Sequence, residues 1–429
     1  MNPQQAPQAF LNANPPVQSD PNQETKITVQ DIFQNHGSDY MLKNKATLWG
    51  RQKKIIYDIT GCMTRKMGGR RFRCQDCRHL MKAYRKCGNR HCPTCGAGIR
   101  RKWVRQQIKE LLPFPYIHIV FRLPEKVTIT LFSNEEKIEV YKAMFDAVNH
   151  AIDKVLRRHK LKTSYLAILH TWGSNMSFHV HIHVMIAGYG VKIRNEKVTA
   201  FQEITFDAGE MEKHFKERFL KEYKKTSRHK RCIEIENGVR FQTYGHKVPY
   251  LPSEQELEDA NWKPFIEPIT QKREVVIGYL GKYYNRVAIT DDDIIALKGG
   301  IVQFKGKDDE NGSVTIHALK VEEFIRRFLR HEIPSRFRHI RPCGLAATRN
   351  KELLKKVRMQ LDSLVADVPA LSQFLYSVAK PSQFLTEDNE IEFKSRRCKK
   401  CGGLYQYEYD IEPEGYDGFN TSRGGDDDG

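Results

Sequence analysis

Long apolar runs are missing from this chain of 429 residues, and no segment approaches the roughly 18 consecutive apolar residues that a membrane-spanning helix needs. Residues 1–25 are rich in Gln, Asn and Pro and have no apolar core, so they do not resemble a secretory signal peptide. We expect them to form a flexible, disordered arm. Apolar residues make up 40% of the chain, which excludes wholesale disorder and, at this length, predicts two or three packed domains.

Acidic residues are also scarce, since 52 Asp and Glu stand against 71 Lys and Arg and leave a net charge of +19. This surplus points to a polyanionic partner, with nucleic acid as the first choice, and a well-solvated basic surface is the simpler alternative. The surplus is uneven along the chain. Residues 62–105 hold fourteen basic residues and a single acid, Asp76, whereas the chain from Leu404 onward holds eight acids and one Arg.

Cysteines are clustered, because six of the ten lie between Cys62 and Cys95. Without a secretory signal, such a cluster indicates metal ligands in a cytosolic protein rather than a disulfide framework. Two C-x-x-C turns suit tetrahedral zinc, and the first-choice ligands are Cys74, Cys77, Cys92 and Cys95. Cys87 and His91 are alternatives or members of a second site, and buried unligated cysteines are the non-functional alternative.

The basic residues around these cysteines are candidates for phosphate contacts. Those singled out are Arg65, Arg70, Arg71, Arg90, Arg100 and Arg101. A lone C-x-x-C, Cys398 to Cys401, lies near the end of the chain. It either recruits Cys343 or Cys232 as further zinc ligands or binds nothing.

Histidines alternate with apolar residues along a predicted strand at 177–187. Alternate residues of a strand share a face, so His179, His181 and His183 are expected to point one way and the β-branched residues between them the other. Three imidazoles on one face can hold a divalent cation. A core strand would gain nothing from them, because burying each unpaired imidazole costs free energy.

Two tyrosines, Tyr279 and Tyr283, are four residues apart in a predicted helix at 271–284 and would share one face. Lys282 and Arg286 lie close by and could hold phosphate. Tyrosines at this spacing are more often core or interface residues. Beside a metal site, however, a tyrosine hydroxyl can attack a phosphodiester and form a covalent phosphotyrosine.

The remaining pattern predicts a mixed chain of helices and strands. Further helices are expected at 26–61, 99–112, 134–160, 206–225, 321–331 and 351–377. Further strands are expected at 116–123, 166–172, 286–289, 301–304 and 314–319, the second of these forming a hairpin with the histidine strand. Residues 247–268 are interrupted by prolines and are expected to form a loop.

Five stretches together resemble the rolling-circle HUH transposases of bacterial insertion sequences, the two-tyrosine kind with an N-terminal zinc-binding domain. They are RKCGNRHCPTC ending at Cys95, HIVFRLP from His118, HTWGSNMSFHVHIHVMIAGYG from His170, YLGKYYNRVAI from Tyr279, and FIRRFLRHEIPSRFRHIRPCGLAATR from Phe324. They span roughly residues 60–350 in the order of the family.

The resemblance implies roles for individual residues. The family's His-hydrophobic-His motif falls on His181 to His183, and the paired nucleophiles fall on Tyr279 and Tyr283. Tyr284 is a rival for the second nucleophile. The third metal ligand stays open between His179, His170 and Glu274, with His179 as our choice. The implied cofactors are structural zinc and a catalytic Mg²⁺ or Mn²⁺, and the implied partner is single-stranded DNA at transposon ends and target.

The sequence therefore predicts an α+β protein with a zinc-binding DNA-recognition domain at 26–112 and a catalytic domain at 113–350. The catalytic domain is expected to hold a central HUH-type antiparallel sheet flanked by helices. A helical C-terminal region, 351–429, would follow, with a possible zinc knuckle and an acidic tail. The expected function is a cytoplasmic, nucleoid-associated bacterial transposase that nicks and rejoins single-stranded DNA. The rivals are a plasmid replication initiator or relaxase and a non-enzymatic zinc-finger binder.

Overall fold

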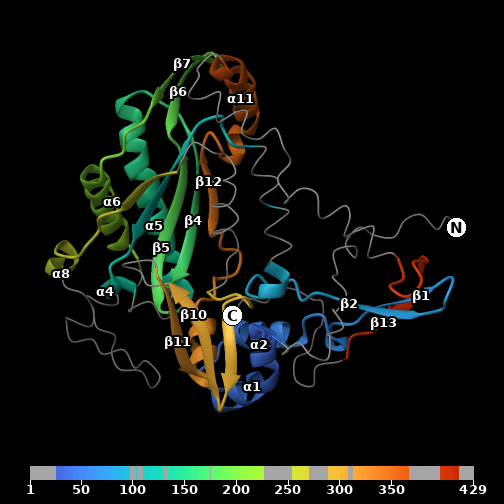
Figure 1. The fold of residues 1–429 in the computed structure, drawn as a ribbon. Coiled ribbons are helices and arrows are strands. Elements are labelled where there is room, and N and C mark those ends of the chain that lie inside the picture. Colours follow the sequence, from blue (N-terminus) through green and yellow to red (C-terminus); the bar gives the residue numbers. More distant parts are fainter. Residues whose placement is uncertain are drawn as a thin grey trace.

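The computed structural model describes residues 26–96, 103, 110–128, 134–173, 175–226, 254–269, 288–307, 313–366 and 397–414. Figure 1 shows a large sheet with helices on both faces, a helical bundle below it, and a small sheet set apart at the side. The expected α+β class with antiparallel sheets is confirmed. Among the described residues, no helix is both long and apolar enough to cross a membrane.

A five-stranded antiparallel sheet forms the centre of the molecule, in the order β12-β4-β5-β3-β8. Its strands are β3 (Tyr116–Arg122), β4 (Ser164–Trp172), β5 (Phe178–Ala187), β8 (Phe265–Ile269) and β12 (Ile340–Gly344). The histidine strand β5 is the middle strand, and its expected hairpin with β4 is confirmed. The predicted loop at 247–268 is wrong in two places, because the helix α8 (Glu254–Glu258) forms within it and β8 forms at its end.

Two strands of this central sheet, β8 and β12, were not predicted from the sequence, and both are edge strands that contain a proline. Proline cannot donate to a ladder, so it disguises a strand in the sequence while being tolerated where one side of the strand is unpaired. Pro268 lies opposite Ile117, and Pro342 lies opposite Leu166. These edge strands complete the sheet on either side of the histidine strand.

The two faces of this sheet bury different cores. One face carries Val180, Ile182 and Val184 of β5 and packs against α5 (Asn134–Arg158) and α6 (Ala208–Tyr223). The other face carries Met185 and packs with α11 (Lys351–Ala366). A ribbon, β6 (Tyr189–Arg194) with β7 (Lys197–Glu203), covers the upper end of this second face (Figure 1). The alternation of β5 is therefore confirmed.

A second hydrophobic core joins the N-terminal helices to a later part of the chain. Helices α1 (Val29–Lys43) and α2 (Gly50–Gly61) share it with α10 (Val321–Arg330) and with one three-stranded sheet. The strands of that sheet are β9 (Ile294–Lys298), β10 (Ile301–Lys307) and β11 (Val314–Lys320). Phe33 of α1 packs edge-on against Phe328 of α10, with ring centroids 5.1 Å apart. The core therefore crosses the boundary expected at residue 112.

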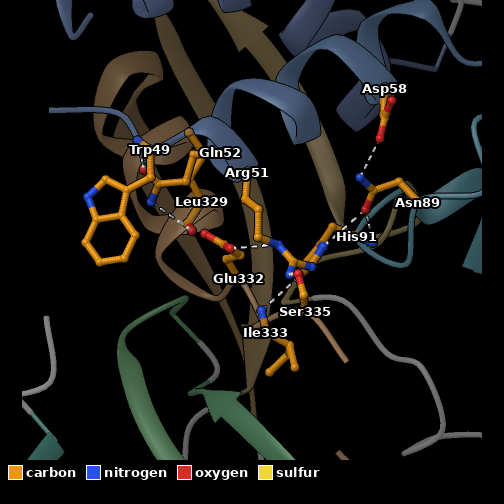
Figure 2. Close-up of polar contacts among 10 residues, drawn as sticks. All are labelled: Trp49, Arg51, Gln52, Asp58, Asn89, His91, Leu329, Glu332, Ile333 and Ser335. Atoms are coloured by element: carbon orange, nitrogen blue, oxygen red, sulfur yellow. Dashed lines mark hydrogen bonds and ion pairs between the residues drawn. The ribbon is translucent and has the colours of Figure 1, made fainter. Parts of the chain in front are cut away.

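Polar contacts reinforce this junction, as Figure 2 shows. Arg51 Nε lies 3.0 Å from Glu332 Oε1, whose side chain is only 1% exposed. The backbone N–H of Ile333 donates to His91 Nε2 at 3.3 Å. An ion pair with a buried carboxylate and a buried hydrogen bond thus tie the cysteine-rich module to the segment that follows α10.

The small sheet is built from both ends of the described chain, in the order β13-β1-β2. Its strands are β1 (Gly69–Cys74), β2 (Leu80–Tyr84) and β13 (Tyr405–Ile411). The C-terminal region is therefore not wholly helical, since only α11 confirms the expected helix at 351–377 over its described part. The described remainder comprises the short helices α4 (Glu125–Thr128), α8 (Glu254–Glu258), η2 (Arg65–Met67) and η3 (Thr348–Asn350).

Candidate metal centres

Three histidines meet on one face of the central sheet, and they come from two adjacent strands. His181 and His183 lie on β5, and His170 lies on β4 directly opposite His181. Their ligating nitrogens all lie within 4.8 Å of one another. His181 Nε2 and His183 Nε2 are 3.0 Å apart, which matches the roughly 3 Å edge between neighbouring ligands of a small divalent ion. The residues present therefore fit a metal ion.

Hydrogen bonds select the nitrogens that face this point. His181 Nδ1 lies 3.0 Å from the carbonyl oxygen of His179, so Nδ1–H donates there and the lone pair of Nε2 is left for a cation. His183 Nδ1 lies 2.9 Å from His118 Nε2 on β3. With Nε2 of His183 turned toward His181, its Nδ1 carries the proton and donates it to His118. Both β5 histidines thus present Nε2.

A further histidine, His118, contacts His183, and a carboxylate, Glu267, lies near His118. His118 is buried, its ring stacks on that of His183 with centroids 5.1 Å apart, and its Nδ1 lies 3.7 Å from Glu267 Oε2 on β8. This carboxylate–histidine–histidine series resembles the outer shell that orients metal-binding imidazoles and raises their basicity. Sequence reasoning missed both residues. His118 has a signal in HIVFRLP, where it alternates with apolar residues, whereas Glu267 has none because β8 was not recognised.

Burial keeps the imidazole of His181 neutral. The pKa of His181 lies well below its usual value because burial disfavours the cation, and neighbouring His170 and His179 lower it further. A neutral imidazole is the form that binds metal. His179, our choice for the third ligand, stays outside the group, although its ring centroid is 5.2 Å from that of His181. His170 takes the third place instead, and the pairing of β4 with β5 shifts register just after it, between His170 and Trp172. Glu274 lies outside the described residues.

The cysteines form a first group of four at the end of α2. Sulfur atoms of Cys62, Cys87, Cys92 and Cys95 all lie within 4.8 Å of one another. Two of the separations, Cys62 to Cys95 and Cys87 to Cys95, are 3.5 Å. Tetrahedral zinc with four thiolates needs an edge of about 3.8 Å, so the donor set and its size fit zinc. Cys62 is a member that the sequence analysis did not single out, because it lies outside any C-x-x-C pair.

The four cysteines expected to share one ion are divided between two groups. Cys92 and Cys95 belong to the first, whereas Cys74 and Cys77 lie against Cys398 and Cys401. His91 joins neither group. Its Nδ1 lies 3.1 Å from Asn89 Oδ1 and its Nε2 accepts from Ile333, so both ring nitrogens are engaged (Figure 2). Cys343, the other suggested partner of the C-terminal pair, lies on β12 next to Tyr165.

The expected phosphate-binding residues have different positions. Arg70 and Arg71 of β1 pair with acids of β13: Arg70 Nε lies 3.1 Å from Asp410 Oδ1, and Arg71 Nε lies 2.8 Å from Glu408 Oε2. Arg90 lines a cavity of about 310 Å³ beside β12, together with Trp103, Arg338 and His339. Arg65 Nε lies 2.9 Å from Glu414 Oε1. The other expected site residues lie outside the described residues. They are Arg100, Arg101, Tyr279, Lys282, Tyr283 and Arg286.

A basic, cysteine-rich module joined to an antiparallel sheet that carries three clustered histidines is typical of a protein that acts on nucleic acid. Comparisons with known proteins make the class specific. A protein-family model described as "Putative transposase" matches residues 165–353, and one described as "Transposase zinc-binding domain" matches residues 32–123. The chain is thus a transposase with a zinc-binding domain.

Two relatives extend the likeness over most of the chain. A "Putative transposase y4qJ" of Sinorhizobium fredii is 29% identical over 385 residues, covering 87% of this chain and 92% of its own. The "Transposase for insertion sequence element IS801" of Pseudomonas savastanoi is 22% identical over 385 residues, covering 86% of both chains. No solved structure matches. The chain belongs to the IS91/IS801 family of two-tyrosine, rolling-circle transposases with an N-terminal zinc-binding domain.

Proposed function

We propose that this transposase nicks and rejoins single-stranded DNA at the ends of its insertion sequence through a covalent 5′-phosphotyrosine, with Tyr279 and Tyr283 as nucleophiles. The observation that carries the proposal is the group of His170, His181 and His183 on the middle strands of the sheet. A protein that only bound DNA would not need a second metal-competent site apart from its zinc module. The central sheet is thereby proposed to be the HUH-type sheet of the family.

The three histidines are proposed to hold Mg²⁺ or Mn²⁺, since imidazole tolerates several divalent metals. Such an ion supplies Lewis-acid polarisation of a phosphodiester oxygen. The chain fixes where this happens. His118 holds the ring of His183, the carbonyl of His179 holds that of His181, and the apolar core of the opposite face holds β5 itself.

The tyrosine hydroxyl is proposed to attack phosphorus. A bond forms between the phenolic oxygen and phosphorus, and the bond from phosphorus to the 3′-oxygen breaks. The phenolic proton leaves the tyrosine, and the departing 3′-oxygen ends as a hydroxyl. A free phenol has a pKa near 10, so a neighbouring cation is needed to favour its anion, and Lys282 is proposed for this. Attack by another 3′-hydroxyl reverses the step and rejoins the strand.

The position of β8 supports this arrangement. Glu267 of β8 lies across from His118, on the side of the sheet that carries the histidines, and β8 ends at Ile269. The described part of β8 ends opposite Tyr116 of β3. The ten residues from Ile269 to Tyr279 span at most about 35 Å when fully extended, which sets the upper limit on the separation of Tyr279 from this edge of the sheet.

Incubation with single-stranded oligonucleotides that carry the element ends tests the proposal. We expect covalent protein–DNA adducts that need a divalent metal, and mass spectrometry should locate them on Tyr279 and Tyr283. Replacing both tyrosines by Phe should abolish adducts and leave DNA binding intact, because only the nucleophilic oxygen is removed. Tyr284→Phe is the matched control and should leave adduct formation unchanged.

Two outcomes would contradict the proposal. Adducts that persist in the Tyr279→Phe/Tyr283→Phe variant would remove both nucleophiles from consideration. Tight, salt-sensitive binding without any metal-dependent cleavage would favour the non-enzymatic zinc-finger reading. Strand transfer between two element ends, compared with nicking at a plasmid origin, separates the transposase from a replication initiator or relaxase.

A further inference from the structure

Cys398 and Cys401 lie beyond both matched segments, since the family models end at residues 123 and 353. The structure nevertheless places these two thiols against Cys74 and Cys77, more than three hundred residues earlier in the chain. Cys74 Sγ is 3.5 Å from Cys401 Sγ, and Cys77 Sγ is 3.5 Å from Cys398 Sγ. All four sulfurs lie within 4.8 Å of one another, and each is a free thiol.

We propose that these four thiols hold a second structural zinc ion, which fastens the C-terminal strand β13 to the N-terminal module. The separations match the roughly 3.8 Å edge of a tetrahedral zinc–thiolate site and exceed by far the length of a disulfide bond. Two cysteines of the group, Cys74 and Cys398, are buried, and the other two are exposed at the surface. Such closed four-thiolate sets are structural rather than catalytic, because they leave no open position.

The backbone of the two C-x-x-C turns is built alike. The N–H of Arg78 donates to the carbonyl of Cys74 at 3.1 Å, and the N–H of Gly402 donates to the carbonyl of Cys398 at 2.8 Å. The N–H of each first cysteine also donates to a carbonyl five residues later, His79 in one turn and Gly403 in the other.

The residue after each second cysteine has a positive φ, 56° at Arg78 and 79° at Gly402. Non-glycine residues adopt such a φ only rarely, so its occurrence at Arg78 indicates that the shape of the turn is required. The first zinc group repeats one element of this pattern, because the N–H of Gly96 donates to the carbonyl of Cys92 at 2.9 Å. Two unrelated segments thus adopt the same ligand-presenting turn.

Close packing brings these turns together independently of the sulfurs. A side chain at Gly403 would meet Asp76 Oδ2 at 2.2 Å, and one at Gly68 would meet the carbonyl oxygen of Ile411 at 2.6 Å. The Gln75 N–H donates to the carbonyl of Leu404 at 3.0 Å, and β13 then pairs along the whole of β1. The two ends of the described chain therefore form one zinc ribbon: two turns, one ion and the sheet β13-β1-β2.

Counting zinc ions per chain by native mass spectrometry tests the proposal on the full-length protein. Cys398→Ser/Cys401→Ser should lose one zinc ion relative to the wild type, and Cys74→Ser/Cys77→Ser should lose one as well. The variant with all four substitutions should also lose only one, because both pairs serve the same ion. Cys343→Ser, a described free thiol outside both groups, is the matched control and should lose none.

Unchanged zinc content in the Cys398→Ser/Cys401→Ser variant would overturn the proposal, as would a loss of two ions in the fourfold variant. Cys401→His is a second variant that should still fold, because histidine is also a zinc ligand and can keep the ion in place. With cobalt in place of zinc, this variant should keep its ion count. Its thiolate-to-cobalt absorption should fall by about an eighth if both groups are filled, since one thiolate of eight is replaced. An unchanged spectrum would contradict ligation by Cys401.

Discussion

At the scale of single residues, the histidine group is organised by hydrogen bonds made on the side away from the expected ion. His183 donates through Nδ1 to His118, which in turn faces Glu267. Each member of this series fixes the tautomer of the next. The negative charge of Glu267 can therefore raise the basicity of buried His183, a proposed metal ligand. Losing a distant member should therefore weaken metal binding without removing a ligand.

Replacing His118 by Phe should lower the affinity for Mn²⁺ by about 10- to 100-fold, because His183 loses the acceptor that orients its ring. Glu267→Gln should have a smaller effect in the same direction, since it removes the charge and keeps the shape. The free Mn²⁺ signal in electron paramagnetic resonance reports binding to the zinc-loaded protein. His181→Ala/His183→Ala should abolish the binding, and exposed His159→Gln should leave it unchanged. Wild-type affinity in His118→Phe would refute the positioning role.

His331 illustrates a buried histidine with a structural role. Burial lowers its pKa to about 3, and the positive charges of Lys137 and Arg330 add to the effect, although its Nε2 lies 3.1 Å from the carbonyl of Met176. In the unfolded chain this histidine binds a proton near pH 6.5, whereas in the folded chain it stays neutral down to about pH 3. The free energy of unfolding therefore falls as the pH drops below about 6.5.

His331→Gln should remove this pH dependence. At pH 7.5 we expect the variant to be less stable than the wild type, because a buried contact is disturbed. Between pH 6.5 and 4.5 the difference in unfolding free energy should shrink by about 1.4 kcal/mol per pH unit, as only the wild type carries the protonation penalty. Urea unfolding of both proteins at several pH values measures this. A constant difference across that range would show that His331 is not the titrating group.

At the scale of elements, strand β13 brings acidic residues beside the arginines of β1. Glu408 pairs with both Arg71 and Arg73, and Asp410 pairs with Arg70. Tyr409 adds a ring to this face, with the guanidinium carbon of Arg71 5.2 Å from its centroid. Arginines that the sequence offers to DNA are therefore partly neutralised by the far end of the same chain.

Glu408→Gln/Asp410→Asn should strengthen DNA binding, because it frees these arginines for phosphates. We expect a gain of about fivefold at moderate salt, and a steeper fall of affinity with rising salt as more counterions are released. Fluorescence anisotropy with a labelled single strand at several salt concentrations measures both. Glu196→Gln/Glu322→Gln, which breaks the exposed pairs with Lys356 and Lys43, removes the same two negative charges and is the matched control for the change in charge. Equal gains in the two variants would mean that only net charge matters.

The elements also show what could be predicted from the sequence. The histidine strand and its hairpin are predictable because alternation is a local signal that survives folding. The assignment of Cys74 and Cys77 is not, because nothing local says that their partners are Cys398 and Cys401 rather than the nearer Cys92. Likewise, Cys62 and Glu267 acquire a role only through contacts distant in sequence. The local sequence pattern identifies which residues can bind a metal. Which of them share one ion depends on contacts that form only in the folded chain.

At the scale of the whole molecule, the cysteine-rich module and the histidine sheet are joined through one buried junction. Helices α1 and α2 share a core with α10, and His91 accepts a hydrogen bond from Ile333 just beyond it. His331 lies between the end of α10 and Ile333 and packs beside Trp172 at the end of β4, and the ring of Trp172 stacks on His170. Under the proposed function, DNA recognition by the first part and cleavage by the second depend on how firmly this junction holds.

The buried pair of Arg51 and Glu332 should be the critical polar contact of that junction. Arg51→Met removes one of the cations near the carboxylate of Glu332, which is 1% exposed, and leaves buried Lys137 nearby, so it should cost more than about 1 kcal/mol of unfolding free energy. Arg51→Met/Glu332→Gln should recover much of this loss, since the buried charge is gone. Lys43→Met breaks a pair with Glu322 between α1 and α10 that is exposed on both sides, and it should cost less than about 1 kcal/mol. Urea unfolding of the three variants distinguishes the cases. If Lys43→Met proved as costly as Arg51→Met, burial would not be what gives the Arg51–Glu332 pair its weight.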